Sequence, residues 1–183
     1  MAENLPHHTP SANPMQSLDW EGEMPDRVRA AFPSLDFKFK NYLGQNFIEI
    51  PSAAVVDVLR FLRDHAQFDM LTDLTAVDRP KDAQRFEIIY VLYSFPRNVY
   101  LRLKAQLSGT ADIPSAVEVF AGANWLEREV FDMFGVTFSG HPHLKRILLP
   151  EEWQGHPLLK ETSITAMDND WVRNNLGIES GQS

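Results

Sequence analysis

Three histidines in the last third of the chain are the residues best suited to bind a metal ion. His141, His143 and His156 could supply imidazole nitrogens, and Glu151 lies between them as a carboxylate. A catalytic zinc needs only three protein ligands. The spacing matches no familiar helical zinc site, however, and Pro142 constrains the first two histidines. We therefore favour histidines that form hydrogen bonds in turns, and we keep a stand-alone His-ligated metal hydrolase as the alternative.

Two carboxylates could form an acid–base pair. Glu129 and Asp132 are three residues apart on one predicted helix, so their side chains share a face, and paired carboxylates can act as general acid and general base. Arg128 stands four residues before Asp132, which is the spacing of a helical ion pair. We favour ion pairing at a surface or an interface, and we predict no catalytic residue in this chain.

The sequence lacks the common motifs for bound cofactors. Gly135 and Gly140 have the spacing of two phosphate-loop glycines, but His141 and Pro142 stand where that loop needs Lys and Ser or Thr. No two glycines are separated by a single residue, which excludes the dinucleotide-binding turn. The chain has no cysteine, so it cannot bind zinc or an iron–sulfur cluster through thiolates. We expect no cofactor in this chain.

The composition is that of an ordinary globular protein with one unusual stretch. The 183 residues are 44% hydrophobic and 23% charged, and the formal net charge is −8. This acidity argues against nucleic acid or anionic lipid as the main partner. No apolar run reaches the 18 residues of a membrane-spanning helix. Residues 134–149, however, contain no Asp or Glu but carry Lys145, Arg146 and two histidines, which suits an acidic partner surface.

An amphipathic helix precedes this basic stretch and positions the charged residues named above. Asn124 can cap the helix, and Glu127 can complete a capping box. Gly135 ends the helix, because glycine readily adopts the left-handed conformation of a helix terminus. The stripe predicted to face a core consists of Leu126, Val130, Met133 and Phe134. The other faces carry Glu127, Arg128, Glu129 and Asp132.

The segment after Gly135 is apolar but too rich in Gly and Pro for a regular element of ordinary length. Within it, GHPHLK at residues 140–145 is echoed by GHPLLK at residues 155–160. An apolar, irregular segment must bury its side chains against something already folded, so we interpret the repeats as two anchor points on another subunit. We therefore expect residues 136–183 to be an extended docking segment, and a chain ending at Gly135 to fold without assembling.

The remaining residues predict an α+β domain over residues 21–135. Residues 35–40 alternate as a half-buried strand and residues 47–50 begin a second, which predicts a hairpin. Residues 86–93 are apolar on both faces, as in a central strand, and pair with the alternating residues 99–107 in a second predicted hairpin. Residues 25–32 and 52–65 have helical stripes, residues 68–77 have strand character, and Pro114 opens a short helix. This order predicts a mostly antiparallel sheet with flanking helices. Residues 1–20 are polar and proline-rich, so we expect a disordered tail there.

Three motifs in this part of the chain resemble a known family. They are EREVFDMFGV at residues 127–136, GHP-x-LKRIL at residues 140–148 and GHPL-x-K at residues 155–160. Together with DLTAVD at residues 73–78 and RFE at residues 85–87, they resemble the C subunit of the proton-pumping NADH:quinone oxidoreductase, respiratory complex I. The resemblance covers about residues 25–160. Phe131 and His143 depart from the family, which often has Tyr and Asp there.

The resemblance implies a scaffolding subunit in the peripheral arm of complex I, on the cytoplasmic side of the bacterial inner membrane. The complex transfers electrons from NADH to quinone, coupled to proton translocation. FMN, iron–sulfur clusters and quinone would be in partner subunits, chiefly the D subunit, which helps form the quinone pocket, and neighbouring cluster-bearing subunits. An equivalent subunit of a related membrane-bound hydrogenase is the alternative. The residues predicted to face partners are Glu127, Arg128, Glu129, Asp132, His141, Pro142, Lys145, Arg146, His156, Pro157 and Lys160.

Overall fold

A six-stranded mixed sheet forms the centre of the structure. The computed structural model describes residues 16–109, 112–162 and 173–174. The strand order is β1-β2-β3-β6-β5-β4, and every pair of neighbours is antiparallel except β3 and β6. The prediction of an α+β fold with a mostly antiparallel sheet is therefore confirmed. The strands are β1 (Leu18–Asp19), β2 (Lys38–Tyr42), β3 (Gln45–Pro51), β4 (Met70–Asp78), β5 (Phe86–Ser94) and β6 (Val99–Leu107).

Both predicted hairpins are present. Leu43 and Gly44 close the turn between β2 and β3 with φ angles of 49° and 79°, and glycine adopts such angles without strain. Residues 95–98 connect β5 to β6, which pair along their whole length. The parallel pair β3–β6 joins the two hairpins, and its register places Phe47 beside Arg102. Because β3 and β6 run in the same direction from these turns, the two hairpin turns lie at the same end of the sheet.

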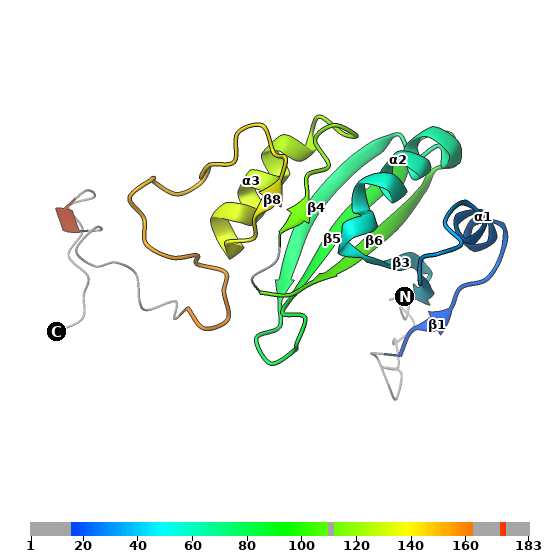
Figure 1. Cartoon of the computed structure of the whole chain (residues 1–183), viewed down its shortest axis with the longest axis horizontal. Helices are drawn as coiled ribbons and strands as arrows, with labels where there is room; N and C mark the ends of the chain where they lie inside the picture. The colour runs from blue at the N-terminus through cyan, green and yellow to red at the C-terminus, as the bar shows by residue number, and fades with distance from the viewer. Residues whose placement is uncertain (1–15, 110–111, 163–172, 175–183) are drawn as a thin grey trace, which may run out of the picture.

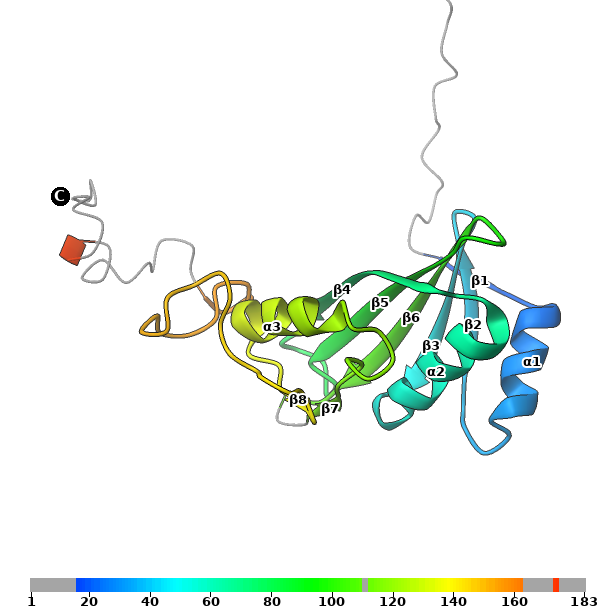
Figure 2. The same cartoon turned by 90° about the horizontal axis from the view of Figure 1, so that it is seen from above.

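The helices of the described residues lie on one face of the sheet (Figure 1 and Figure 2). They are α1 (Glu23–Ala31), α2 (Val55–Ala66), preceded by a 3₁₀ turn (Ser52–Ala54), and α3 (Ala123–Phe134). Their apolar stripes cover the inward side chains of the strands, because alternate residues of a strand point to opposite faces. The fully buried inward residues include Ile88, Tyr90, Leu92 and Leu103. The other face carries no helix in the part of the chain that the structure describes.

The folded domain begins earlier than predicted. Leu18 and Asp19 pair with the outer edge of β2, and the Trp20 ring packs edge-on against Phe39 with centroids 6.1 Å apart. Residues 18–20 therefore do not belong to a tail, since a backbone ladder and an aromatic contact fix them. Residues 1–15 of the predicted tail lie outside the described residues.

The helix predicted to open at Pro114 is absent. Ile113 and Pro114 instead form the short strand β7 (Ile113–Pro114), which pairs in parallel with β8 (Phe138–Ser139). Residues 116–120 then make a hydrogen-bonded turn. The strand forms because the chain returning from α3 supplies a backbone partner for residues 113–115, and local sequence cannot reveal such a partner.

Helix α3 ends as predicted, but it begins differently. Gly135 closes its C-terminus at φ 74°. The helix starts at Ala123, and Gly122 precedes it without a side-chain cap, so the capping box of Asn124 and Glu127 does not form. The C-terminal strip, defined here as residues 136–160, contains β8 and otherwise consists of turns and irregular backbone. It loops around α3 at the end of the molecule farthest from α1 (Figure 1 and Figure 2).

None of the helices in the described ranges is both long enough and apolar enough to cross a lipid bilayer.

The expectation that a chain ending at Gly135 folds is revised by this architecture. Val136 and Phe138 are each only 3% exposed and belong to the core, and burial of each stabilises the fold by about 1.5–3 kcal/mol. A chain ending at Gly135 lacks these two side chains and also the strip residues that bind the buried charges of α3. Their loss should remove most of the free energy of unfolding, which is about 5–15 kcal/mol for a domain. We predict that residues 1–135 show no cooperative thermal transition by circular dichroism, whereas residues 1–162 do. Equal melting temperatures for the two chains would contradict this.

Candidate functional site

The carboxylate of Asp132 fixes the C-terminal strip to α3. Its Oδ2 atom accepts hydrogen bonds from three successive backbone N–H groups, those of Ile147 (3.0 Å), Leu148 (2.8 Å) and Leu149 (2.9 Å). Successive N–H groups that point to one site form a concave nest for an anion. Here the anion is a side chain of the same protein, and it is fully buried.

Arg146 supplies the counter-charge of Asp132. Its guanidinium donates to Asp132 Oδ1 at 2.6 Å and to the carbonyl oxygen of Gly155 at 2.9 Å. One side chain therefore joins the helix, the middle of the strip and the second GHP turn. A charge-assisted hydrogen bond of this kind is shorter and stronger than one between neutral groups.

Arg128 holds the strip one turn earlier on the same helix face. Its guanidinium donates to the carbonyl oxygens of Lys145 (3.1 Å) and Arg146 (3.0 Å). The same group lies over the Trp125 ring, 5.1 Å from its centroid, in a cation–π arrangement. Trp125, Arg128 and Asp132 lie three and four residues apart, so they form one line along α3 against which residues 145–149 are held.

These bonds determine the charge state of Asp132. Burial alone would raise the pKa of this carboxyl group, because it disfavours the charged form. The backbone N–H groups of Leu149, Leu148 and Ile147, with the Arg146 guanidinium, outweigh burial and lower the pKa below its usual value. Asp132 is therefore ionised at neutral pH. The stability that it contributes is present above the unfolded-state pKa and is lost as the pH falls through the folded-state pKa.

The two GHP turns attach to opposite ends of α3. The His141 ring nitrogen Nε2 lies 3.1 Å from the carbonyl oxygen of Asn124, and His156 Nδ1 lies 2.9 Å from that of Asp132. Gly135 makes the second contact possible, because a Cβ atom there would lie 2.6 Å from Cδ2 of His156. The repeats are thus paired anchor points as predicted, but they are attached to the chain's own helix.

The end of the strip reaches back to the sheet. The Leu158 N–H donates to the carbonyl oxygen of Met133 (3.0 Å), and the Lys160 N–H donates to Asp78 Oδ2 (2.8 Å) at the end of β4. Arg85 pairs with Asp78 at 2.7 Å and with Glu161 at 3.0 Å. The Arg85 guanidinium lowers the pKa of Asp78, chiefly by hydrogen bonding. Sequence reasoning did not assign Asp78 or Arg85 to the site, although both lie in motifs of the family resemblance.

Glu127 fixes residues 115 and 116 to the other side of α3. Its fully buried carboxylate accepts hydrogen bonds from the Ser115 hydroxyl and the Ala116 N–H, both at 2.6 Å. Burial raises its pKa to about 7, although both hydrogen bonds act in the opposite direction. The buried hydroxyl of Tyr90 has no hydrogen-bond partner in the structure. Burial raises the Tyr90 pKa well above its ordinary value, and the Glu127 charge raises it further.

The predicted catalytic alternatives do not match this geometry. Asp132 is buried under the strip while Glu129 is exposed, so the two do not form an acid–base pair. The favoured ion pair of Arg128 with Asp132 is also absent, since both groups bind strip backbone. His141 and His156 contact carbonyl groups eight residues apart, about 12 Å along a helix axis. The described residues contain no cluster of three or more potential metal ligands.

The predicted partner-facing residues divide into two groups. Glu127, Arg128 and Asp132 are buried within the chain and so serve its own structure first. Glu129, Pro142, Lys145 and Lys160 are exposed, while His141, Arg146, His156 and Pro157 are partly exposed. Contact of these exposed residues with a partner stays a prediction. Three large apolar side chains border the same helix and are at least half exposed: Trp125 (61%), Leu148 (61%) and Leu158 (50%).

The fold and this site define a class of protein: a small α+β domain whose charged helix fixes an irregular, apolar strip at its surface. The chain belongs to the family described as "Respiratory-chain NADH dehydrogenase, 30 Kd subunit", whose model matches residues 48–168.

Individual relatives agree with this family. The chain is 47% identical over 124 residues to the C subunit of NADH-quinone oxidoreductase from Rhodobacter capsulatus, a match that covers 67% of this chain and 62% of the relative. It is 40% identical over 126 residues to the C/D subunit of the same enzyme from Bdellovibrio bacteriovorus, covering 69% of this chain and 22% of that protein. The matched segment thus spans less than two thirds of either relative.

A solved structure shows the same fold. One chain of the membrane-bound sulfane sulfur reductase, an archaeal respiratory membrane complex, superposes with a TM-score of 0.68 over 87% of this chain and 93% of its own length. At 21% sequence identity this likeness concerns the fold alone.

Replacement of Asp132 by Asn should release residues 147–149 from α3 while the sheet stays folded. The amide would leave Arg146 without its counter-charge and would turn an N–H₂ group toward backbone donors. We expect the free energy of local opening to fall by about 3 kcal/mol. Hydrogen exchange should show amides of Ile147, Leu148 and Leu149 exchanging roughly a hundredfold faster. The matched control is Asp73→Asn at an exposed site on β4. Unchanged protection in Asp132→Asn would refute the proposed anchoring.

Replacement of Glu127 by Gln should change how stability depends on pH. Because the Glu127 pKa is about 7 when folded, against an ordinary value of 4.5, the folded state retains a proton that the unfolded state loses. Its contribution is therefore complete below pH 4.5 and is lost as the pH rises through 7, at most about 3 kcal/mol. Urea unfolding between pH 4.5 and 8 should show a flatter profile for Glu127→Gln than for wild type or the exposed control Glu129→Gln. Identical profiles would rule this out.

Proposed function

We propose that this chain is a non-catalytic scaffolding subunit of NADH-quinone oxidoreductase, in which it supports assembly and the quinone-site subunit. The observation that carries the proposal is the strip on α3. Two buried charges, Arg128 and Asp132, hold an apolar segment in one conformation. Its exposed side chains at Leu148 and Leu158 have no cover in the described residues. Solvent-exposed apolar side chains fixed in place beside an aromatic residue are typical of protein interfaces.

The partner proposed for this surface is the D subunit. The fused C/D subunit of Bdellovibrio bacteriovorus supports this choice, because one polypeptide there carries both names. The proposed wider partners are neighbouring subunits of the peripheral arm that carry iron–sulfur clusters. The proposed location is the cytoplasmic side of the bacterial inner membrane, as a peripheral part of the complex.

The proposed role includes no electron transfer by this chain. The absence of cysteine from the sequence supports that assignment, because iron–sulfur clusters are held mainly by thiolates. FMN, the clusters and the bound quinone would then reside in partner subunits, where electrons pass from NADH to quinone. This chain would act by fixing the position of the quinone-site subunit.

The proposal predicts what purifies with the full-length tagged chain in mild detergent. Mass spectrometry should identify the other subunits of NADH-quinone oxidoreductase, and the preparation should oxidise NADH with quinone. We expect Leu148→Ser to reduce the recovered complex about tenfold, because one buried leucine contributes about 1.5–3 kcal/mol. Leu18→Ser, at a leucine that is 67% exposed on the distant strand β1, is the matched control.

Three results would count against the proposal. Recovery of the tagged chain without any other subunit would contradict the scaffolding role. Co-purification with hydrogenase subunits would assign the chain to a related complex. Equal recovery of the complex with Leu148→Ser and Leu18→Ser would indicate that the partner surface does not lie beside α3.

A further inference from the structure

The helix-free face of the sheet carries one basic side chain without a partner. Arg102 lies at the middle of this face, and its guanidinium alone among those of the arginines that the structure describes has neither a hydrogen bond nor an ion pair. Asp73 is the carboxylate aligned with it, but Val91 of β5 stands between them, so two strand spacings of about 4.8 Å separate their backbones. The lysines of the face are all paired, as Lys38–Glu49 (3.2 Å), Lys40–Asp19 (2.7 Å) and Lys104–Glu87 (3.6 Å).

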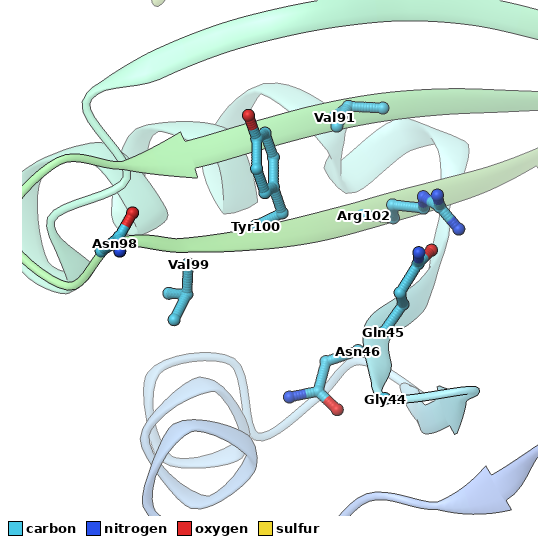
Figure 3. Close-up of a pocket in the computed structure, with 8 residues that line it drawn as sticks. All are labelled: Gly44, Gln45, Asn46, Val91, Asn98, Val99, Tyr100 and Arg102. Atoms are coloured by element: carbon cyan, nitrogen blue, oxygen red, sulfur yellow. The ribbon is translucent and has the colours of Figure 1, made fainter. Parts of the chain in front are cut away.

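Arg102 lines a pocket of about 480 Å³ between β3 and β6 (Figure 3). The ladder between these strands begins at the Phe47–Arg102 pair, so the strand ends before it separate and leave a gap. Arg102 lies on the β6 side of this pocket, and Gln45 lies across from it on β3 (Figure 3). The rest of the lining includes the apolar side chains Val91, Val99 and Tyr100 and the amides Gln45 and Asn46.

The chemistry of this lining selects a carboxylate. An unpaired guanidinium offers a planar fork of donors that fits both oxygens of a carboxylate group. The neighbouring amides can donate further hydrogen bonds, and no acidic side chain lines the pocket among the residues that the structure describes.

The rim of the pocket indicates that the carboxylate belongs to a protein. Tyr100 is 63% exposed, and the strand turns beside it present Phe95 (63%) and Leu43 (75%). Tyrosine, phenylalanine and arginine are enriched in protein interfaces, where a central anchor is surrounded by apolar contacts. A small carboxylate would occupy only part of this pocket of about 480 Å³ and would leave the rim uncovered, whereas a polypeptide segment would cover both.

We propose that this pocket receives an aspartate or glutamate side chain from a partner subunit, whose neighbouring apolar side chains pack on Tyr100, Phe95 and Leu43. The inference rests on the proposed function in taking the partner to be another subunit of the same complex. Gly44 and Asn98 of the two hairpin turns line the pocket, and these turns lie at the end of the sheet opposite to α3 and the C-terminal strip (Figure 2). The chain therefore joins two neighbours, one at each end.

The test places a photo-crosslinking amino acid at Val99, at the edge of the pocket, in the full-length chain within its own complex. Irradiation should link this position to one subunit, and the linked peptide should contain an acidic residue beside apolar ones. Arg102→Glu should lower the yield of that cross-link at least about tenfold, the effect of replacing one charge-assisted hydrogen bond by repulsion. Replacing the acidic residue of the partner by Arg should restore the yield in the Arg102→Glu chain.

Arg97→Glu is the matched control, because it makes the same charge change at the same end of the sheet outside the pocket. Equal loss with both variants, no cross-link, or no rescue in the paired reversal would overturn the proposal. Tight, saturable binding of acetate or succinate to the isolated chain, seen by NMR at the Arg102 guanidinium, would also overturn it in favour of a small ligand. An intact complex with an undiminished cross-link in Arg102→Glu would refute this inference and leave the proposed function standing. Failure of the wild-type chain to purify with any complex would refute the proposed function.

Discussion

The arrangement of the C-terminal strip depends on one buried negative charge. The strip contains too little regular structure to satisfy its own backbone, and a buried N–H group without a partner costs about 1–3 kcal/mol. Asp132 satisfies three such groups at once and is itself neutralised by Arg146. A hydrophobic contact could have held the strip with equal strength, but it would not have fixed which backbone atoms lie against the helix. The buried charge therefore sets the register of the strip as well as its position.

The elements with strong periodicity could be predicted from the sequence. The alternation over residues 99–107 and the stripe of α2 each depend on burial of one face, and the apolar run over residues 86–93 is typical of a central strand, so the pattern alone predicts these elements. The α3 terminus at Gly135 was predictable because a left-handed residue favours glycine. In contrast, β7 forms only because residues 138 and 139 return beside it. Strand β1 likewise depends on the outer edge of β2.

The site was only half predictable for a related reason. The residue types on α3 pointed to charged interactions, and the repeated GHP turns pointed to two anchors. Their partners could not be inferred, because Glu127, Arg128 and Asp132 bind backbone groups, which every residue carries and no sequence pattern distinguishes. Buried charged positions on a helix resemble exposed ones when only periodicity is considered. Burial separates the two cases, and burial is a property of the folded chain.

The hydrogen bond from Lys160 to Asp78 joins residues 82 positions apart. Loop closure over that distance is slow unless the intervening chain is already compact, so the end of the strip can settle only after β4 and α3 have formed. We therefore expect the surface bearing Leu148 and Leu158 to acquire its shape after the sheet and α3, among the residues that the structure describes. A partner that recognises this surface would select finished molecules from incomplete ones, which gives the order of folding a direct influence on the order of assembly.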